Sequence, residues 1–186
     1  MWKLRDIVVA AILSVVCGAI YMGWDFFNQA LTAAWSPVAQ GLLNGLWWLA
    51  AGLVPYIIRR PGAAFFAEVV SAFFEFAFGS PYQFGAVISG LVQGAGSEVG
   101  FALGRWRHYN AGFMMLAGAL GGVGNTLQYY FQYGGNKLAF GVMFGYFVTT
   151  VISGAILGGL LPKWIGDALN RTGTLRNFEI GRQARR

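Results

Sequence analysis

The chain has 186 residues, of which 56% are hydrophobic and only 11% are charged, and its formal net charge is +6. This composition, with a mean hydropathy of +0.54, excludes an ordinary soluble domain and indicates a membrane protein. A single cysteine, Cys17, excludes an internal disulfide.

Six charge-poor runs are long enough to cross a bilayer, which takes about 20 apolar residues in a helix. In chain order they are Ile7–Trp24, Pro37–Ile58, Pro61–Gly79, Gln83–Gly104, Ala111–Tyr133 and Leu138–Leu161. The first run ends without a small-residue cleavage site, so we interpret it as a retained span and not as a signal peptide. The pattern predicts an all-α membrane protein, a compact bundle of six transmembrane helices within residues 1–162.

The basic residues predict the orientation of this bundle. Twelve of the thirteen fall on one side of the six-span arrangement, and only Lys137 falls on the other. Because cytoplasmic loops carry an excess of Lys and Arg, we predict that both the N- and C-termini are cytoplasmic. The net positive charge then follows from topology, and we expect no nucleic acid partner, since no soluble domain presents a basic face.

Small residues predict how the helices pack. Many of the 28 glycines are four residues apart, so they share a helix face and let two helices approach closely in lipid. The first helix has a related stripe of Ala10, Ser14 and Gly18. This stripe either packs within the bundle or receives a helix from another subunit, and the sequence leaves both alternatives open.

Two segments lie outside the predicted spans. Asp25–Ser36, on the outer side, mixes aromatic and polar residues and is either a lid over a cavity or an aromatic belt at the interface. Residues 163–186 combine apolar residues with six basic ones. We expect this tail to be a basic amphipathic segment on the cytoplasmic face of the lipid bilayer.

Three of the seven acidic residues lie inside predicted spans, Glu68 and Glu75 in the third and Glu98 in the fourth. An ionisable group at membrane depth costs about 3 kcal/mol or more, so it normally faces the protein interior and marks a substrate or ion path. At about 1.5 Å of rise per residue, Glu75 lies at a mid-to-outer level and the other two lie deeper. The alternative is that these carboxylates only brace helices.

Polar and aromatic residues near the level of Glu75 predict a binding chamber. The candidate substrate-binding residues are Glu75, Gln93, Trp47, Trp48, Asn125, Gln128, Tyr129, Tyr146 and Trp35, with Glu68 and Glu98 deeper. A carboxylate accepts from an amino group, while aromatic faces stack a ring and attract a cation. The set suits a flat, nitrogen-rich organic molecule, including a cationic one. For each aromatic residue alone, the alternative is packing or an interfacial belt.

No catalytic, cofactor or metal site is expected. The only histidine, His108, lies among basic residues at the inner edge of a span. The sequence has no metal-ligand cluster, P-loop or dinucleotide motif. Transport energy would therefore come from an ion gradient or from a partner subunit.

A family resemblance is carried by three stretches of the chain: Gly90-Leu91-Val92-Gln93-Gly94-Ala95-Gly96-Ser97-Glu98, Phe101-Ala102-Leu103 and Met1-Trp2-Lys3-Leu4-Arg5-Asp6. With six spans in under 200 residues, the chain resembles the YkoE family, the S components (substrate-binding subunits) of energy-coupling factor transporters for thiamine and hydroxymethylpyrimidine. The resemblance implies capture of such a small-molecule substrate from outside the cell membrane. It also implies that a transmembrane coupling subunit and two ATPase subunits drive release.

The resemblance assigns roles to two segments as well. In S components an Ala-xxx-Ala motif of the first helix contacts the coupling subunit, and Ala10 and Ser14 stand at the matching positions, with Gly18 continuing the stripe. The family pattern also makes Asp25–Ser36 the substrate lid. Two other functions stay open at this point: a proton-coupled secondary carrier for a small organic cation, and a non-transporting structural membrane protein.

Overall fold

The computed structural model describes residues 2–32 and 35–183 of the chain. These residues form helices and turns, with no strand among them. In chain order the helices are α1 (Leu4–Thr32), α2 (Pro37–Gly41), η1 (Asn44–Trp48), α3 (Leu49–Ile58), α4 (Ala63–Ala77), α5 (Phe84–Leu103), α6 (Ala111–Gln132), η2 (Gly135–Lys137), α7 (Phe140–Ser153), η3 (Gly154–Leu160), α8 (Leu161–Arg171) and α9 (Glu179–Gln183).

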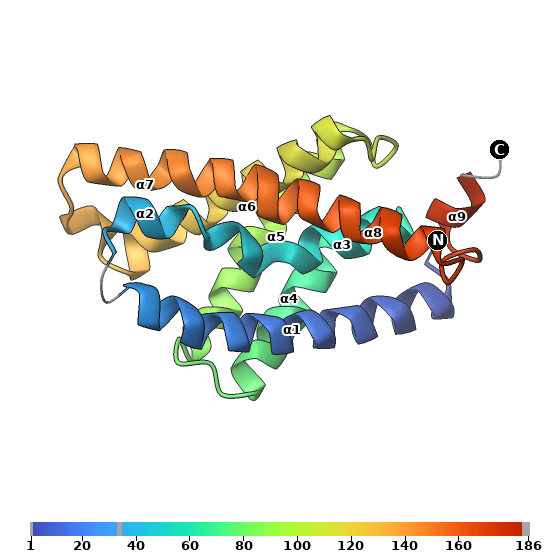
Figure 1. The fold of residues 1–186 in the computed structure, drawn as a ribbon, viewed down its shortest axis with the longest axis horizontal. Helices are drawn as coiled ribbons and strands as arrows, with labels where there is room; N and C mark the ends of the chain where they lie inside the picture. Colours follow the sequence, from blue (N-terminus) through green and yellow to red (C-terminus); the bar gives the residue numbers. More distant parts are fainter. Residues whose placement is uncertain (1, 33–34, 184–186) are drawn as a thin grey trace.

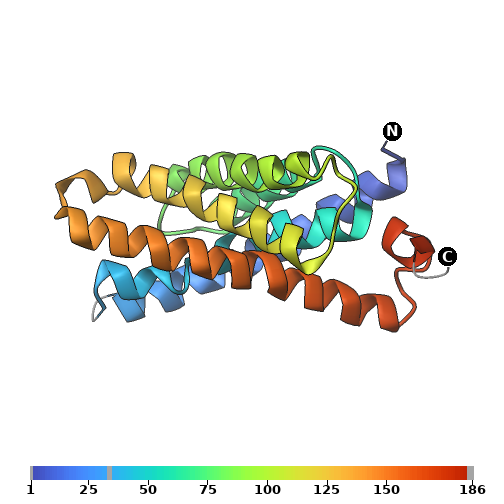
Figure 2. The same cartoon turned by 90° about the horizontal axis from the view of Figure 1, so that it is seen from above.

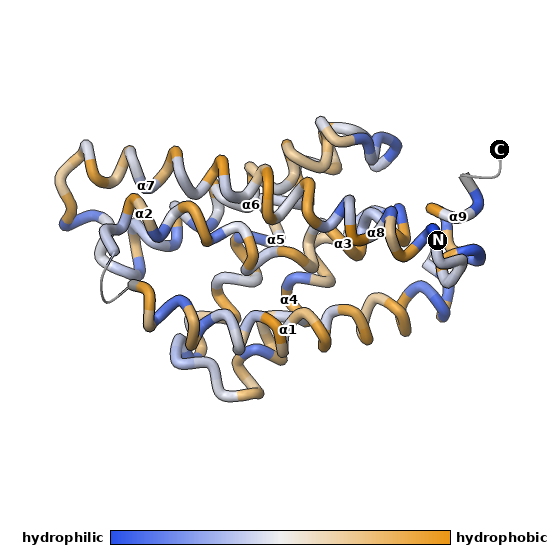
Figure 3. The backbone as a smooth tube through the Cα atoms, in the orientation of Figure 1, coloured by the Kyte–Doolittle hydropathy of each residue, from blue (hydrophilic) through white to orange (hydrophobic). Residues whose placement is uncertain are grey.

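The longer helices form six rods, which confirms the six-helix bundle (Figure 1). The second rod comprises α2, η1 and α3, and the sixth comprises α7, the π-helical stretch η3 and α8. Among the residues that the structure describes, four rods are long and apolar enough to cross a membrane: Leu4–Leu31, Pro37–Ile58, Phe84–Leu103 and Phe140–Arg171. Figure 3 shows hydrophobic residues along α1 and α7, while hydrophilic residues gather near the chain ends. The chain is therefore a multi-pass membrane protein.

The second rod is broken in the middle of the bundle. Ser36 caps α2 by accepting a hydrogen bond from the Ala39 amide, and Pro37 occupies the first turn. The rod then tightens into the 3-10 helix η1 before α3 begins at Leu49. All ten residues of α3 are buried. Because the first amides of a helix have no partner within it, the start of α3 needs hydrogen-bond acceptors from neighbouring helices.

Close contacts at glycines pack the rods, as the four-residue spacing predicts. A Cβ atom on Gly96 of α5 would lie 2.2 Å from the Leu120 carbonyl oxygen of α6. A Cβ on Gly118 of α6 would lie 2.1 Å from the Gly154 carbonyl oxygen of η3. Such distances leave no room for any side chain, so glycine is required where these helices cross.

The small-residue stripe of α1 is buried within the chain, and at Gly18 it packs against α4. Ala10 and Ser14 have 0% exposed surface. At Gly18 there is no room for a side chain, because a Cβ atom there would lie 2.6 Å from the Ser71 carbonyl oxygen. Of the two alternatives left open by the sequence, the structure supports packing within the chain. A partner helix could reach the stripe only if α1 separated from the helices that cover it.

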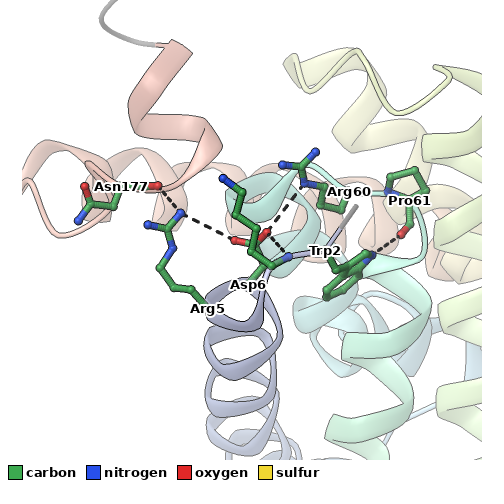
Figure 4. Close-up of polar contacts among 7 residues, drawn as sticks. Trp2, Arg5, Asp6, Arg60, Pro61 and Asn177 are labelled. Atoms are coloured by element: carbon green, nitrogen blue, oxygen red, sulfur yellow. Dashed lines mark hydrogen bonds and ion pairs between the residues drawn. The ribbon is translucent and has the colours of Figure 1, made fainter.

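The N-terminal segment, the turn between α3 and α4, and the C-terminal segment meet at one end of the bundle (Figure 1, Figure 2). Figure 4 shows the contacts that join them. The Trp2 indole nitrogen donates to the Pro61 carbonyl at 3.0 Å, and Arg5 donates to the Asn177 carbonyl at 2.6 Å. Asp6 lies 3.9 Å from the Arg60 guanidinium. Both chain ends therefore lie at the same end of the molecule.

The C-terminal segment folds back onto the bundle. The boundary predicted between residues 162 and 163 falls inside the continuous rod of α7, η3 and α8. Beyond α8 the chain turns, and Leu175, Phe178 and Ile180 are buried against the core. The apolar residues of the predicted amphipathic tail therefore have two kinds of surroundings. These three are buried against the rest of the protein, while Trp164 is exposed.

Candidate substrate-binding site

One large cavity, of about 490 Å³, lies in the half of the bundle where α1 ends and α7 begins. This volume is within the range of roughly 300–1,000 Å³ that small-molecule sites occupy. The cavity is lined by Asn28, Gln29, Gln40, Asn44, Trp47, Glu68, Ala72, Glu75, Tyr82, Ala86, Ser89, Gly90, Gln93, Asn125, Gln128, Tyr129, Tyr133 and Tyr146.

Eight of the eleven candidate residues line this cavity together. They come from η1, α4, α5, α6 and α7, and they are Trp47, Glu68, Glu75, Gln93, Asn125, Gln128, Tyr129 and Tyr146. The predicted chamber of carboxyl, amide and aromatic groups therefore exists as a single space. The remaining three candidates, Trp35, Trp48 and Glu98, lie elsewhere.

Both excluded tryptophans have other surroundings. Trp48 is fully buried and does not line the cavity, and its indole nitrogen donates to the Gly118 carbonyl at 2.9 Å. It packs against Gly154 and Gly158 of η3, whereas its neighbour Trp47 faces the cavity. Trp35 precedes α2, is 41% exposed and does not line the cavity.

Glu98 caps the start of α4 from the neighbouring α5. Its Oε1 accepts from the Gly62 amide and from the Trp106 indole, both at 2.6 Å. Its Oε2 accepts from the Ala64 amide at 2.9 Å and from the Phe65 amide at 3.2 Å. Since the first amides of a helix lack partners and favour a negative charge, this carboxylate joins α4 to α5 and has no place in the cavity wall.

Sequence reasoning missed several polar wall residues. Asn28 and Gln29 belong to the segment interpreted as a lid or a belt, and Asn44 stands within an apolar run. Asn28 and Asn44 are both buried polar side chains. A buried amide is costly without hydrogen-bond partners. An asparagine inside an apolar run could therefore have been used to predict a polar part of the cavity wall.

The segment Asp25–Ser36 begins as the last turns of α1, and its role as a lid stays a prediction. Helix α1 continues to Thr32, and residues 33–34 lie outside the described part of the chain. Asn28 and Gln29 form part of the cavity wall. Phe26 and Phe27, on the other face, are more than half exposed, in the manner of an interfacial belt.

One wall of the cavity is aromatic and fixed by a hydrogen-bond network. The rings of Tyr129 and Tyr146 stack with their centroids 4.1 Å apart. The Tyr146 hydroxyl donates to Asn125 Oδ1 at 3.0 Å and accepts from Asn44 Nδ2 at 2.8 Å. Asn44 also donates to the Thr150 hydroxyl at 3.0 Å. These bonds hold the stacked pair in one orientation, which presents a flat apolar face to a ligand.

A second wall of the cavity carries carboxyl groups from α4. Glu68 Oε2 accepts from the Tyr21 hydroxyl at 3.0 Å and from the Ala51 amide at 3.1 Å. The Tyr21 hydroxyl in turn accepts from the Ala50 amide at 2.8 Å. Glu68 thus supplies an acceptor for the broken second rod while it also borders the cavity. Glu75 lies about two turns further along α4 and is buried at the same wall.

This arrangement has a definite binding chemistry. None of the described residues that line the cavity is a Lys, an Arg or a His. A ring can stack on Tyr129, its amino groups can donate to carboxyl and amide oxygens, and a positive charge would face carboxyls and aromatic rings. No group of three or more His, Cys, Asp and Glu side chains that could hold a metal ion occurs in residues 2–32 and 35–183.

Comparisons with known proteins place the chain in a family. Residues 5–124 match the model of the ABC-type cobalt transport system, permease component. The chain is 32% identical, over 185 residues, to a protein of Bacillus subtilis (strain 168) that bears the provisional name HMP/thiamine permease protein YkoE. That alignment covers 100% of this chain and 93% of the relative.

A solved crystal structure of an S component of an ECF (energy-coupling factor) transporter has the same fold. The TM-score is 0.97 at 32% sequence identity, and the match covers 100% of this chain and 94% of the other. The chain belongs to the YkoE family of ECF transporter S components. The resemblance seen in the sequence is therefore confirmed, and so is the fold class that it implied. As an S component, the protein is a substrate-binding membrane subunit of a transporter and not an enzyme.

Proposed function

We propose that this S component captures thiamine, or its hydroxymethylpyrimidine precursor, from the outer side of a bacterial cytoplasmic membrane. The observation that carries the proposal is a single cavity that is lined both by the carboxyl groups of Glu68 and Glu75 and by the stacked pair of Tyr129 and Tyr146. The name of the Bacillus subtilis relative, which includes HMP and thiamine, supports the same ligand class.

Thiamine has chemical features that match both walls. Its aminopyrimidine is a flat ring with an amino group, which suits stacking on Tyr129 and donation to an oxygen of Glu75 or Gln93. Its thiazolium ring carries a permanent positive charge, which suits a wall with carboxyl groups and no basic side chain. Hydroxymethylpyrimidine has only the first of these rings, so it would use part of the same cavity.

We further propose that a transmembrane coupling subunit and two ATPase subunits drive the release of the substrate into the cell. This rests on membership of the S components. The cavity lies in the half of the bundle remote from the two chain ends, and the positive-inside rule assigns those ends to the cytoplasm. The cavity would therefore open towards the outside, where the substrate is captured.

A stability screen of the purified protein in detergent tests the ligand class. Because a ligand that binds only the folded state raises its apparent stability, thiamine and hydroxymethylpyrimidine should each raise the melting temperature. Biotin, an anionic vitamin, serves as the control and should not. Stabilisation by biotin alone would contradict the proposal.

An uptake assay tests the energy source. Cells that express this S component with the coupling and ATPase subunits should accumulate labelled thiamine. Cells that express it with an ATPase subunit inactivated in its nucleotide site should not. Equal accumulation in both would instead support the proton-coupled secondary carrier.

A further inference from the structure

Asp25 of α1 lies directly behind the carboxyl wall of the cavity. It is fully buried and does not line the cavity, but it is adjacent to Glu75, which does, because the Ser80 hydroxyl lies within 3.5 Å of both carboxyl groups. Two donors reach Asp25. The Trp47 indole nitrogen donates to Oδ1 at 2.7 Å, and the Ser80 hydroxyl donates to Oδ2 at 2.5 Å.

These contacts identify Asp25 as the ionised member of the pair. Charge-assisted bonds to a carboxylate are short, about 2.7–2.9 Å from nitrogen and about 2.5–2.7 Å from a hydroxyl. Both bonds to Asp25 have such lengths. The Ser80 hydroxyl has a single proton, and its distance of 3.5 Å to Glu75 Oε1 is much longer. Ser80 therefore donates to Asp25 and not to Glu75.

The same contacts place a proton on Glu75. An ionised carboxylate only accepts hydrogen bonds, so two of them cannot bond to each other. Adjacent carboxyl groups that share a site hold one proton between them, because like charges in contact cannot both ionise. Asp25 already accepts hydrogen bonds from Trp47 and Ser80. Glu75 therefore carries the proton and donates a hydrogen bond to Asp25.

The groups around the pair supply no positive charge. Glu68 faces it from α4 itself, Tyr82 from the turn after α4, and Tyr133 from the end of α6. None of these is a cation, and the described lining of the cavity includes no basic residue. The Asp25–Glu75 pair thus carries one negative charge, which is held on Asp25.

We propose that Asp25 is a specificity-determining residue, which supplies the negative charge that favours a cationic ligand, while Glu75 presents a neutral carboxyl group to that ligand. Asp25 acts as a positioning residue, through Glu75 and through its field in a low-dielectric wall. The inference rests on the proposed function, and it assigns to the hidden carboxylate the charge that the sequence assigned to Glu75.

Two isosteric variants, Asp25→Asn and Glu75→Gln, separate the roles of the carboxyl groups. Titration calorimetry at pH 8 would compare thiamine, a permanent cation, with hydroxymethylpyrimidine, which is uncharged there. Since a charge in a poorly solvated wall interacts strongly with an ionic partner, Asp25→Asn should weaken thiamine binding about 10- to 100-fold and change hydroxymethylpyrimidine binding less than about 3-fold. In Glu75→Gln the amide can still donate to Asp25, so the charge of Asp25 is kept. Because Glu75 lines the cavity, any loss should affect both ligands alike, and the ratio of the two affinities should change less than about 3-fold.

Asp6→Asn is the matched control, because Asp6 is another buried carboxylate of α1, at the opposite end of the bundle. It should leave both affinities unchanged. Retained binding of hydroxymethylpyrimidine by Asp25→Asn shows that the variant is folded. If it binds neither ligand, Asp25→Glu replaces it. Because this variant keeps the negative charge, the ratio of the two affinities should stay within about 3-fold of the wild type, and loss of the preference for thiamine there contradicts the inference.

The inference is wrong if Glu75→Gln loses thiamine binding selectively while Asp25→Asn keeps the wild-type preference. That outcome would leave the proposed function intact, since the wild type would still bind thiamine. Wild-type protein that binds neither ligand would contradict the proposed function itself.

Discussion

At the scale of single residues, the three membrane carboxylates of α4 and α5 have different surroundings and should respond differently to the same substitution. Glu98→Gln replaces one acceptor oxygen by an NH₂ group that faces backbone amides of α4, which also donate. A charge-assisted bond contributes about 1.5–3 kcal/mol, so we expect the free energy of unfolding to fall by about that amount. Denaturant unfolding in detergent measures it.

Ligand binding provides the counter-test for Glu98. Because the residue lies outside the cavity, the folded fraction of Glu98→Gln should bind thiamine with wild-type affinity. Trp106→Phe removes only one of the four donors and should destabilise less. Wild-type stability with lost thiamine binding in Glu98→Gln would return this carboxylate to the binding site.

A second residue-scale prediction concerns the aromatic wall. Tyr146→Phe keeps the stacked ring against Tyr129 but removes the hydroxyl that joins Asn44 to Asn125. Loss of these neutral bonds, at about 0.5–1.5 kcal/mol each, should weaken thiamine binding roughly 3- to 10-fold. Calorimetric titration checks this, and Tyr130→Phe on the outer face of α6 is the control. Equal effects of the two variants would contradict a role for the network.

Depth and residue type were sufficient to predict eight of the side chains that line the cavity, since helical rise relates sequence position to level. They were not sufficient to predict direction. Trp47 and Trp48 are adjacent at the same depth, but only Trp47 faces the cavity, because the 3-10 geometry of η1 decides which side each occupies. Asp25 of α1 and Glu75 of α4 are 50 residues apart in the sequence, and no local sequence pattern predicts that they are paired.

At the scale of helices, the contact of α1 with α4 should control the carboxyl wall. Gly18→Leu forces a side chain against the Ser71 carbonyl oxygen, and such overpacking costs about 1–3 kcal/mol or more. Because α4 carries Glu68 and Glu75, we expect the melting temperature and thiamine affinity to fall together. Val16→Leu, on the exposed face of α1, should change neither.

This experiment also decides between the two interpretations of the stripe. If Gly18→Leu binds thiamine normally in detergent but loses transport with the coupling subunit, the stripe serves a partner and not α4. The spacing of small residues predicted a close helix contact, and the structure has one. The choice of neighbour could not be predicted, because α4 and a foreign helix would use the same stripe. The break in the second rod was also unpredictable, since Leu42 and Leu43 resemble any apolar helix.

At the scale of the whole molecule, the fold was the most predictable feature, because bilayer thickness sets the length of each apolar run. The structure places the start of α1 and the end of α9 at the same end of six rods (Figure 1). Twelve of thirteen basic residues predict that this end is cytoplasmic. A reporter that functions only in the cytoplasm should be active when it is fused after Arg186. Activity at that position of a reporter that functions only outside would contradict this orientation.

The central claim is that the cavity binds thiamine, and titration calorimetry of the wild type beside Ala86→Trp tests it most directly. Ala86 is 1% exposed and lines the cavity, so an indole there occupies space that the ligand needs. We predict saturable one-to-one binding of thiamine by the wild type and its loss in Ala86→Trp, while Ile12→Trp, on the exposed face of α1, binds normally. Undiminished binding by folded Ala86→Trp would contradict the claim.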